Sequence, residues 1–188
     1  MTSTDSTPAG TDRRDALVES IFRGTIGTLE LLHIYLGDRL GLYARLAEAD
    51  SASPGELAKL AGIAERYARE WLEQQAVAGV LDVAEETGDP HTRRYRLPPG
   101  VDEVLIQPES LNLLAPLAPL VVGIAQALPQ VIEAFRSGGG VPYEAYGADV
   151  RTGIARLNRA GADNPIRAAQ AACSYSWRRP LSRSRRRT

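Results

Sequence analysis

The stretch that decides the fold is SASPGELAKLAGIAERYAREWLEQQAVAGVL, residues 51–81. Ser53 stands at a helix N-cap, Pro54 at the first helical position, and Glu56 three residues after the cap. This spacing predicts a capping box, in which two backbone N–H groups at the start of the helix are satisfied reciprocally. Gly62 can adopt the left-handed conformation that ends such a helix. A short helix followed by a tight turn is therefore expected here.

A second helix is expected to follow at once, over residues 64–78. One face of it is apolar and carries Ile63, Tyr67, Trp71, Leu72 and Gln75. The chain then reads as strand, polar turn and strand over residues 80–97, with Gly88-Asp89-Pro90 making the turn. Helix, short turn, helix and β-hairpin is the order of a winged helix-turn-helix.

The sequence on both sides of this motif is helical in pattern. Apolar residues recur at helical spacing over residues 15–36, and a second helical pattern covers residues 111–136. A glycine-rich loop interrupts it, and a short helix resumes over residues 149–159. The predicted fold is mainly α (α+β): a winged-helix domain with a small hairpin wing at residues 14–110, then a helical segment at 111–164. Residues 1–13 are polar and are expected to be disordered.

Charge weighs against nucleic acid as a partner. The chain has a net charge of −1, but residues 165–188 hold seven arginines and no acids, which leaves a net charge of −8 on residues 1–164. In the expected second helix, glutamates at positions 65, 70 and 73 outnumber the arginines at 66 and 69. An acidic recognition helix is poor for phosphate contact, although the arginines at 93, 94 and 96 in the wing leave DNA reading open as an alternative.

The remaining composition restricts location and chemistry. Cys173 is the single cysteine, so no internal disulfide can form, and a reducing cytoplasmic location is expected. Two distant histidines and one cysteine give no metal-ligand spacing, and no catalytic residue is assigned. The apolar run at 111–132 is long enough to span a membrane, but its three prolines and its amides predict a helix buried between domains or subunits instead.

The loop SGGGVPYEAYG, residues 137–147, permits two interpretations. Three consecutive glycines, 138–140, allow any backbone conformation, and Pro142 stiffens the exit from the loop. The segment is either a flexible hinge between helices or a lid whose Tyr143 and Tyr146 face a ligand.

Three segments together show a family resemblance: ELLHIYLGDRLGLYARLAE at 30–48, residues 53–81, and GGGVPYEAYGADVRTGIARLNRAG at 138–161. They resemble the N-terminal half of class I S-adenosylmethionine-dependent methyltransferases, in which a winged-helix dimerisation domain precedes a Rossmann-like catalytic domain. The resemblance implies a homodimer, with a helical segment that helps to cover a small-molecule substrate in the full-length enzyme. By the same resemblance, Tyr143 and Tyr146 would rim the substrate pocket.

The sequence departs from that family at the cofactor site. S-adenosylmethionine binding in the family needs a strand that ends in an acidic residue, followed by a glycine-rich turn, and no such segment is present. The sequence thus predicts no Rossmann-like domain, no cofactor-binding residue and no methyl transfer by this chain alone. Residues 165–188 are expected to be a disordered aberrant tail from a frameshift, or else a genuine basic tail.

Three functions remain open at this point. The first is the dimerisation and substrate-covering portion of a methyltransferase, truncated before its catalytic domain. The second is a winged-helix transcription regulator that binds DNA, and the third is a stand-alone oligomerisation module.

Overall fold

The computed structural model describes residues 9–161 and divides into two compact units, Met1–Ile106 and Gln107–Thr188. The unit boundary lies four residues before the expected domain boundary at residue 110. Predictions for residues 1–8 and for the tail at 165–188, Cys173 included, fall outside the described residues.

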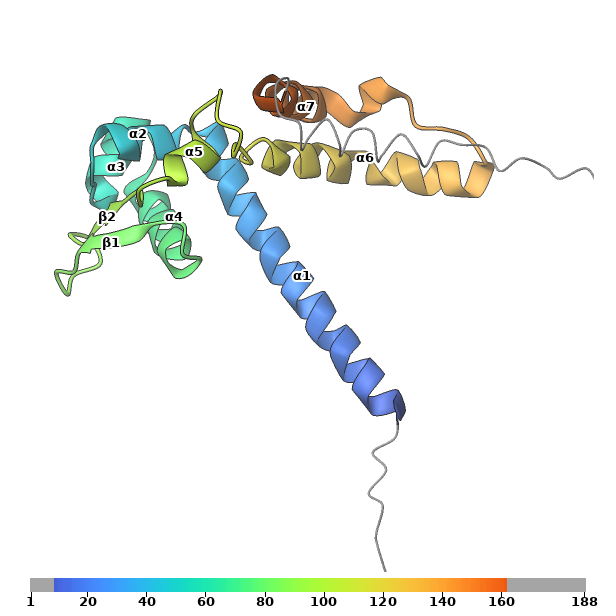
Figure 1. Ribbon diagram of the computed structural model, residues 1–188, viewed down its shortest axis with the longest axis horizontal. Helices are drawn as coiled ribbons and strands as arrows, with labels where there is room; N and C mark the ends of the chain where they lie inside the picture. The colour runs from blue at the N-terminus through green and yellow to red at the C-terminus, as the bar shows by residue number, and fades with distance from the viewer. Residues whose placement is uncertain (1–8, 162–188) are drawn as a thin grey trace, which may run out of the picture. The chain divides into compact units, whose positions relative to one another are not determined.

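The described part of the first unit, residues 9–106, contains five helices and a hairpin (Figure 1). In chain order these are α1 (Ala9–Arg39), α2 (Leu42–Glu48), α3 (Pro54–Ala61), α4 (Glu65–Val77), β1 (Asp82–Glu85), β2 (Arg94–Arg96) and α5 (Val101–Leu105). The two strands are antiparallel, with Val83 opposite Tyr95, and Ala52 pairs with the other edge of β2. This is the winged-helix order, and it confirms the mainly α fold with a small hairpin wing.

The capping box at the start of α3 is present as predicted. The backbone N–H of Glu56 donates to the Ser53 hydroxyl at 3.4 Å, and the backbone N–H of Ser53 donates to the Glu56 carboxylate at 2.9 Å. Gly62 ends the helix with a φ of 66°. The two-helix motif is therefore set largely by local hydrogen bonds between neighbours in sequence.

The core of this unit is built around two aromatic side chains. The rings of Tyr43 and Trp71 meet edge to face, with centroids 5.1 Å apart. The Tyr43 hydroxyl donates to the side-chain oxygen of Gln75, which is fully buried. The Trp71 indole N–H donates to the backbone carbonyl of His33, 3.0 Å away, and so ties α4 to α1. Both helices are thereby fixed against α2.

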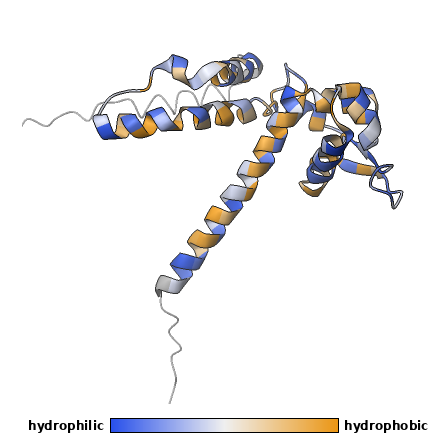
Figure 2. Cartoon of the chain, turned by 180° about the vertical axis from the view of Figure 1, so that it is seen from behind, coloured by the Kyte–Doolittle hydropathy of each residue, from blue (hydrophilic) through white to orange (hydrophobic). Residues whose placement is uncertain are grey.

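The structure corrects the expected start of α1. The helix begins at Ala9, whereas residues 1–13 were expected to be disordered and the helix to begin at Asp15. Asp12 lies in the first turn, where a carboxylate interacts favourably with the positive end of the helix dipole. Apolar residues recur along α1 beyond its first two turns (Figure 2), and many are exposed to solvent.

Up to residue 161, where the described part of the chain ends, the second unit contains α6 (Leu117–Ser137), the 3-10 helix η1 (Tyr143–Tyr146) and α7 (Gly147–Gly161) (Figure 1). α6 starts six residues later than the expected Leu111, because Pro116 occupies its N-cap and a residue before proline avoids helical backbone angles. α6 and α7 approach closely at glycines: a Cβ at Gly123 would lie 2.6 Å from the Val150 side chain. The two helices form an antiparallel pair joined by the glycine loop.

By length and composition α6 could cross a bilayer, with a mean hydropathy of 1.5 over its most apolar window. Only 22% of that window is buried in this structure. The exposed apolar side chains follow helical spacing along one face: Leu117, Val121, Ile124, Leu128, Ile132 and Phe135. The helix expected to be buried therefore presents an apolar stripe.

Candidate functional site

The exposed side of α4 carries charges that pair with one another. Arg66 donates to Glu70 at 3.0 Å, and Arg69 lies 3.9 Å from Glu73. At the start of the helix, Glu65 contacts the ring of His91 at 3.1 Å, which brings the wing against α4. These pairs leave no excess of positive charge along the helix that would enter a DNA groove.

The wing arginines are also held by carboxylates. Arg93 donates to Glu86 at 2.9 Å, and this bond, followed by the Gly88 backbone N–H, lowers the pKa of Glu86. Arg94 reaches Glu56 at 2.7 Å and the backbone carbonyl of Ser51 at 2.8 Å. The third wing arginine, Arg96, lies 3.7 Å from Asp82. The wing is therefore a carboxylate-paired face.

The pKa of Glu56 is lowered for reasons visible in the same cluster. The backbone N–H of Ser53 is the largest cause, and the hydrogen bond from Arg94 is the second. One carboxylate thus completes the cap of α3 and anchors the wing. Its role in this structure is to join two elements.

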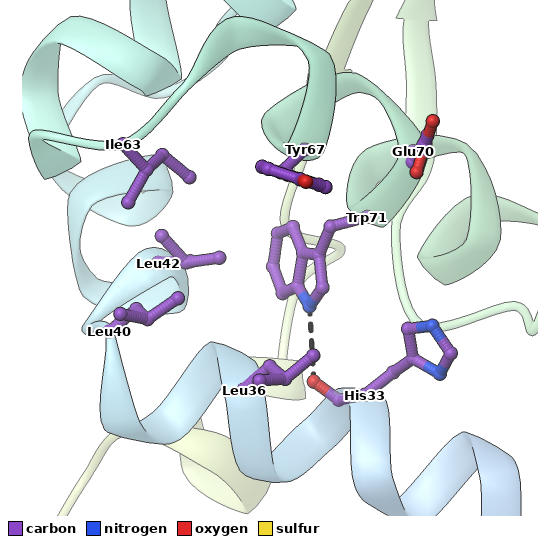
Figure 3. A pocket seen from close by; sticks show the side chains of 8 residues that line it. All are labelled: His33, Leu36, Leu40, Leu42, Ile63, Tyr67, Glu70 and Trp71. Atoms are coloured by element: carbon purple, nitrogen blue, oxygen red, sulfur yellow. Dashed lines mark hydrogen bonds between the residues drawn. The ribbon is translucent and has the colours of Figure 1, made fainter.

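An apolar groove of about 340 Å³ lies between α1 and α4 (Figure 3). Three of its lining residues come from the C-terminal end of α1 and the turn after it, and the others from α2, the α3–α4 turn and α4: His33, Leu36, Leu40, Leu42, Ile63, Tyr67, Glu70 and Trp71. The Trp71 indole lies at the back of the groove, held by its bond to His33, whereas Tyr67 is 65% exposed.

The chemistry of this groove suits an apolar side chain. Its two ionisable side chains other than Tyr67 already have partners: Glu70 accepts from Arg66, and the His33 Nδ1 lies 2.9 Å from the carbonyl of Leu29. Sequence reasoning missed the groove, because its walls come from residues some 30 positions apart. The only signal was the apolar spacing of Leu36 and Leu40 beside Tyr67.

The structure places both predicted rim residues in η1. Tyr143 is 53% exposed, and the backbone carbonyl of Tyr146 lies 3.1 Å from where a Cβ at Gly123 would stand. The 3-10 helix therefore packs by its backbone on α6. A role for the two tyrosines at a substrate pocket stays a prediction. Within residues 9–161, no three His, Cys, Asp or Glu side chains are grouped to hold a metal ion.

The winged-helix part of the chain is similar to a known domain family. Residues 28–106 match the sequence profile of the Rv2258c-like winged HTH domain. These residues form a winged helix-turn-helix domain. The N-terminal part of α1, residues 9–27, precedes the matched region. No curated protein sequence matches the chain.

Solved structures of methyltransferases resemble the chain beyond the winged-helix domain. They include the mitomycin 7-O-methyltransferase MmcR, with 20% identity, a TM-score of 0.59, and coverage of 87% of this chain and 49% of that one. The riboflavin-derivative dimethyltransferase RosA from Streptomyces davawensis has 16% identity and a TM-score of 0.60, and the match covers 84% of this chain and 48% of that one. Human N-acetylserotonin methyltransferase, solved with SAM, has 16% identity and a TM-score of 0.58, and the match covers 91% of this chain and 50% of that one. The chain thus shares the fold of the N-terminal half of these proteins and spans about half their length.

Proposed function

We propose that this chain is the subunit-pairing and substrate-covering N-terminal portion of an S-adenosylmethionine-dependent methyltransferase. One observation carries the proposal: 84–91% of the chain superposes on about half of three methyltransferases. That coverage takes in the helices that follow the winged-helix domain. A winged-helix domain alone is shared by proteins of many functions.

Subunit pairing is supported by the surface of α1. The helix has 31 residues, and its N-terminal half exposes large apolar side chains, with Phe22 68% exposed. Contiguous apolar surface of this kind marks an interaction site in a protein that stays in solution. A homodimer is the simplest arrangement that covers it.

Substrate covering is assigned to α6, η1 and α7. The glycine loop at 138–140 lets the chain turn back, since Gly138 ends α6 with a φ of 73°. Tyr143 and Tyr146 then stand on a short helix that is anchored to α6 and partly open to solvent. In a full-length enzyme, these side chains would contact a small-molecule substrate.

The described residues do not fit the cofactor. A class I methyltransferase holds its nucleoside at a glycine-rich turn between a parallel strand and a helix. Residues 9–161 contain one two-stranded antiparallel sheet, whose hairpin loop is occupied by ion pairs. We therefore expect no methyl transfer from the 188-residue chain alone, and we place it in the cytoplasm because it carries a single cysteine.

Isothermal titration calorimetry with S-adenosylmethionine tests the proposal. The 188-residue chain should give no binding heat at S-adenosylmethionine concentrations up to about 1 mM, the upper end of the range of about 1 μM to 1 mM that enzyme KM values cover. Dissociation in the micromolar range would contradict our account of the cofactor site. A strict monomer in multi-angle light scattering would contradict the pairing role.

A further inference from the structure

The apolar seam of α1 is symmetric about its middle residue. It consists of six exposed side chains of α1 and of Leu40, whose backbone N–H donates to the Leu36 carbonyl and continues the last turn of the helix: Val18, Phe22, Ile26, Leu29, Leu32, Leu36 and Leu40. Measured from Leu29, the other six lie three, seven and eleven residues away in each direction. At 3.6 residues per turn, these offsets return to one side of the helix. The spacing of the apolar residues along the seam is thus the same in both directions from Leu29.

The two ends of the seam differ in what surrounds them. At the C-terminal end, Leu36 and Leu40 form one wall of the 340 Å³ groove, opposite Tyr67 and Trp71 (Figure 3). At the N-terminal end, Phe22 and Val18 are 68% and 62% exposed. One end therefore provides a hollow and the other end provides side chains that could fill it.

We infer that α1 pairs in antiparallel fashion with α1 of a second copy of this chain, with Leu29 at the two-fold axis and Phe22 seated in the partner's groove. The inference rests on the proposed pairing function and specifies its surface and register. In this register, Phe22 of one copy lies opposite Leu36 of the partner. Ile26 lies opposite Leu32, and Val18 opposite Leu40.

A second copy is the occupant that the symmetry selects. A two-fold interface requires each surface to complement itself, and a seam that is symmetric about Leu29 meets this condition in the antiparallel direction. One operation fills both grooves and covers both exposed ends at once. No charged residue interrupts the seam, since Glu19, Arg23 and Glu30 stand beside it on the helix.

The area available is that of a stable interface. With Leu17, Ile21 and Tyr67 at its margins, the seam exposes on the order of 900 Å² of side chain, near the ~800 Å² that each partner contributes to a standard interface. The contact also involves residues 9–27, which precede the region matched to the winged-helix family. The pairing surface therefore begins within the matched domain and extends beyond it along the N-terminal part of α1.

Disulfide cross-linking in the full chain tests the register, in a C173S background that lacks the native cysteine. L29C should form a covalent dimer on mild oxidation, because the two copies meet at this residue. F22C combined with L36C should also give a covalent dimer. These two positions are 14 residues, about 21 Å, apart on one helix, too far for a bridge within the chain. S20C, on the opposite face of α1, is the matched control and should stay reduced.

The outcomes separate this inference from the proposed function. If the protein is a dimer in light scattering and the single variant F22C, without L36C, forms a covalent dimer, the two helices pair in parallel, and this would overturn the register. A dimer in which L29C reacts no faster than S20C would show pairing elsewhere, and would overturn the inference while the pairing function stands. A monomer at about 50 μM, far above the dissociation constant of a stable interface, would overturn both.

Discussion

At the scale of single residues, Glu56 connects the two parts of the winged helix. Its carboxylate accepts from the Ser53 backbone N–H, which caps α3, and from Arg94 in β2. Arg94 in turn donates to the carbonyl of Ser51, immediately before the cap. The carboxylate that completes the cap of α3 thus also positions the wing, because it holds Arg94 of β2.

The lowered pKa of Glu56 makes this link dependent on pH. A carboxylate whose pKa is lower in the folded protein than its ordinary value of 4.5 adds stability above that value, and the stability is lost as pH falls through the folded pKa. Glu56→Gln should therefore lower the free energy of unfolding at neutral pH, by less than ~1 kcal/mol because the pair is half exposed. The difference from wild type should shrink below about pH 4.

Urea unfolding between about pH 7 and pH 3 measures this difference. Following Trp71 fluorescence in a W177F background confines the signal to the winged-helix unit, since the chain has two tryptophans. Parallel curves for wild type and Glu56→Gln over the whole range would contradict the role given to this carboxylate.

At the scale of elements, replacing either of two glycines of α1 by alanine should change stability in opposite directions. A Cβ at Gly37 would lie 2.4 Å from the Tyr43 ring and 2.7 Å from the Trp71 ring, whereas a Cβ at Gly24 would meet nothing within 4 Å. Gly37→Ala should destabilise the unit by about 1–3 kcal/mol through overpacking. Gly24→Ala should stabilise the helix by up to ~1 kcal/mol, because alanine is the better helix former.

Thermal unfolding followed by circular dichroism compares the two variants directly. They share the same helix and the same chemical change, so each is the control for the other. Equal midpoints for Gly37→Ala and Gly24→Ala would show that α1 does not pack on Tyr43 and Trp71 as described.

Helices with local signals could be predicted from the sequence, and contacts between distant segments could not. The cap at Ser53 and the stop at Gly62 involve neighbours in sequence, so α3 was placed within a residue of its observed bounds. The start of α1 was missed because residues 9–14 show no apolar periodicity and continue a helix that forms downstream. Helix propagation costs less than nucleation, so a weak segment can extend a strong one.

In the candidate site, too, features set by neighbours in sequence could be predicted and contacts between distant segments could not. The three wing arginines could be identified from the sequence, but their carboxylate partners could not, because residues such as Arg94 and Glu56 are 38 positions apart. The groove beside Trp71 depends on four separate segments and had no local signature. The assignment of Tyr143 and Tyr146 to a substrate pocket comes from resemblance alone and stays a prediction.

At the scale of the whole molecule, charge decides between the proposed function and DNA reading. Residues 65–96, which comprise α4 and the wing, hold five arginines and seven carboxylates. All five arginines lie within 4 Å of a carboxylate. Binding to DNA depends on cations that neutralise phosphates and release counterions, and freeing these arginines would first break their existing pairs.

A shortened chain that ends at Asn164 tests whether the winged helix binds DNA at all. Without the seven arginines of residues 165–188, the remaining chain has a net charge of −8 and should not shift duplex DNA at about 100 mM salt, even at ~10 μM protein. If the full chain binds, its affinity should fall steeply with salt and show no sequence preference, because that binding would come from the arginine-rich segment. Sequence-selective binding by the shortened chain is the opposite result. It would mean that α4 releases its arginines to the bases despite their carboxylate partners, and it would favour a transcription regulator over a methyltransferase portion.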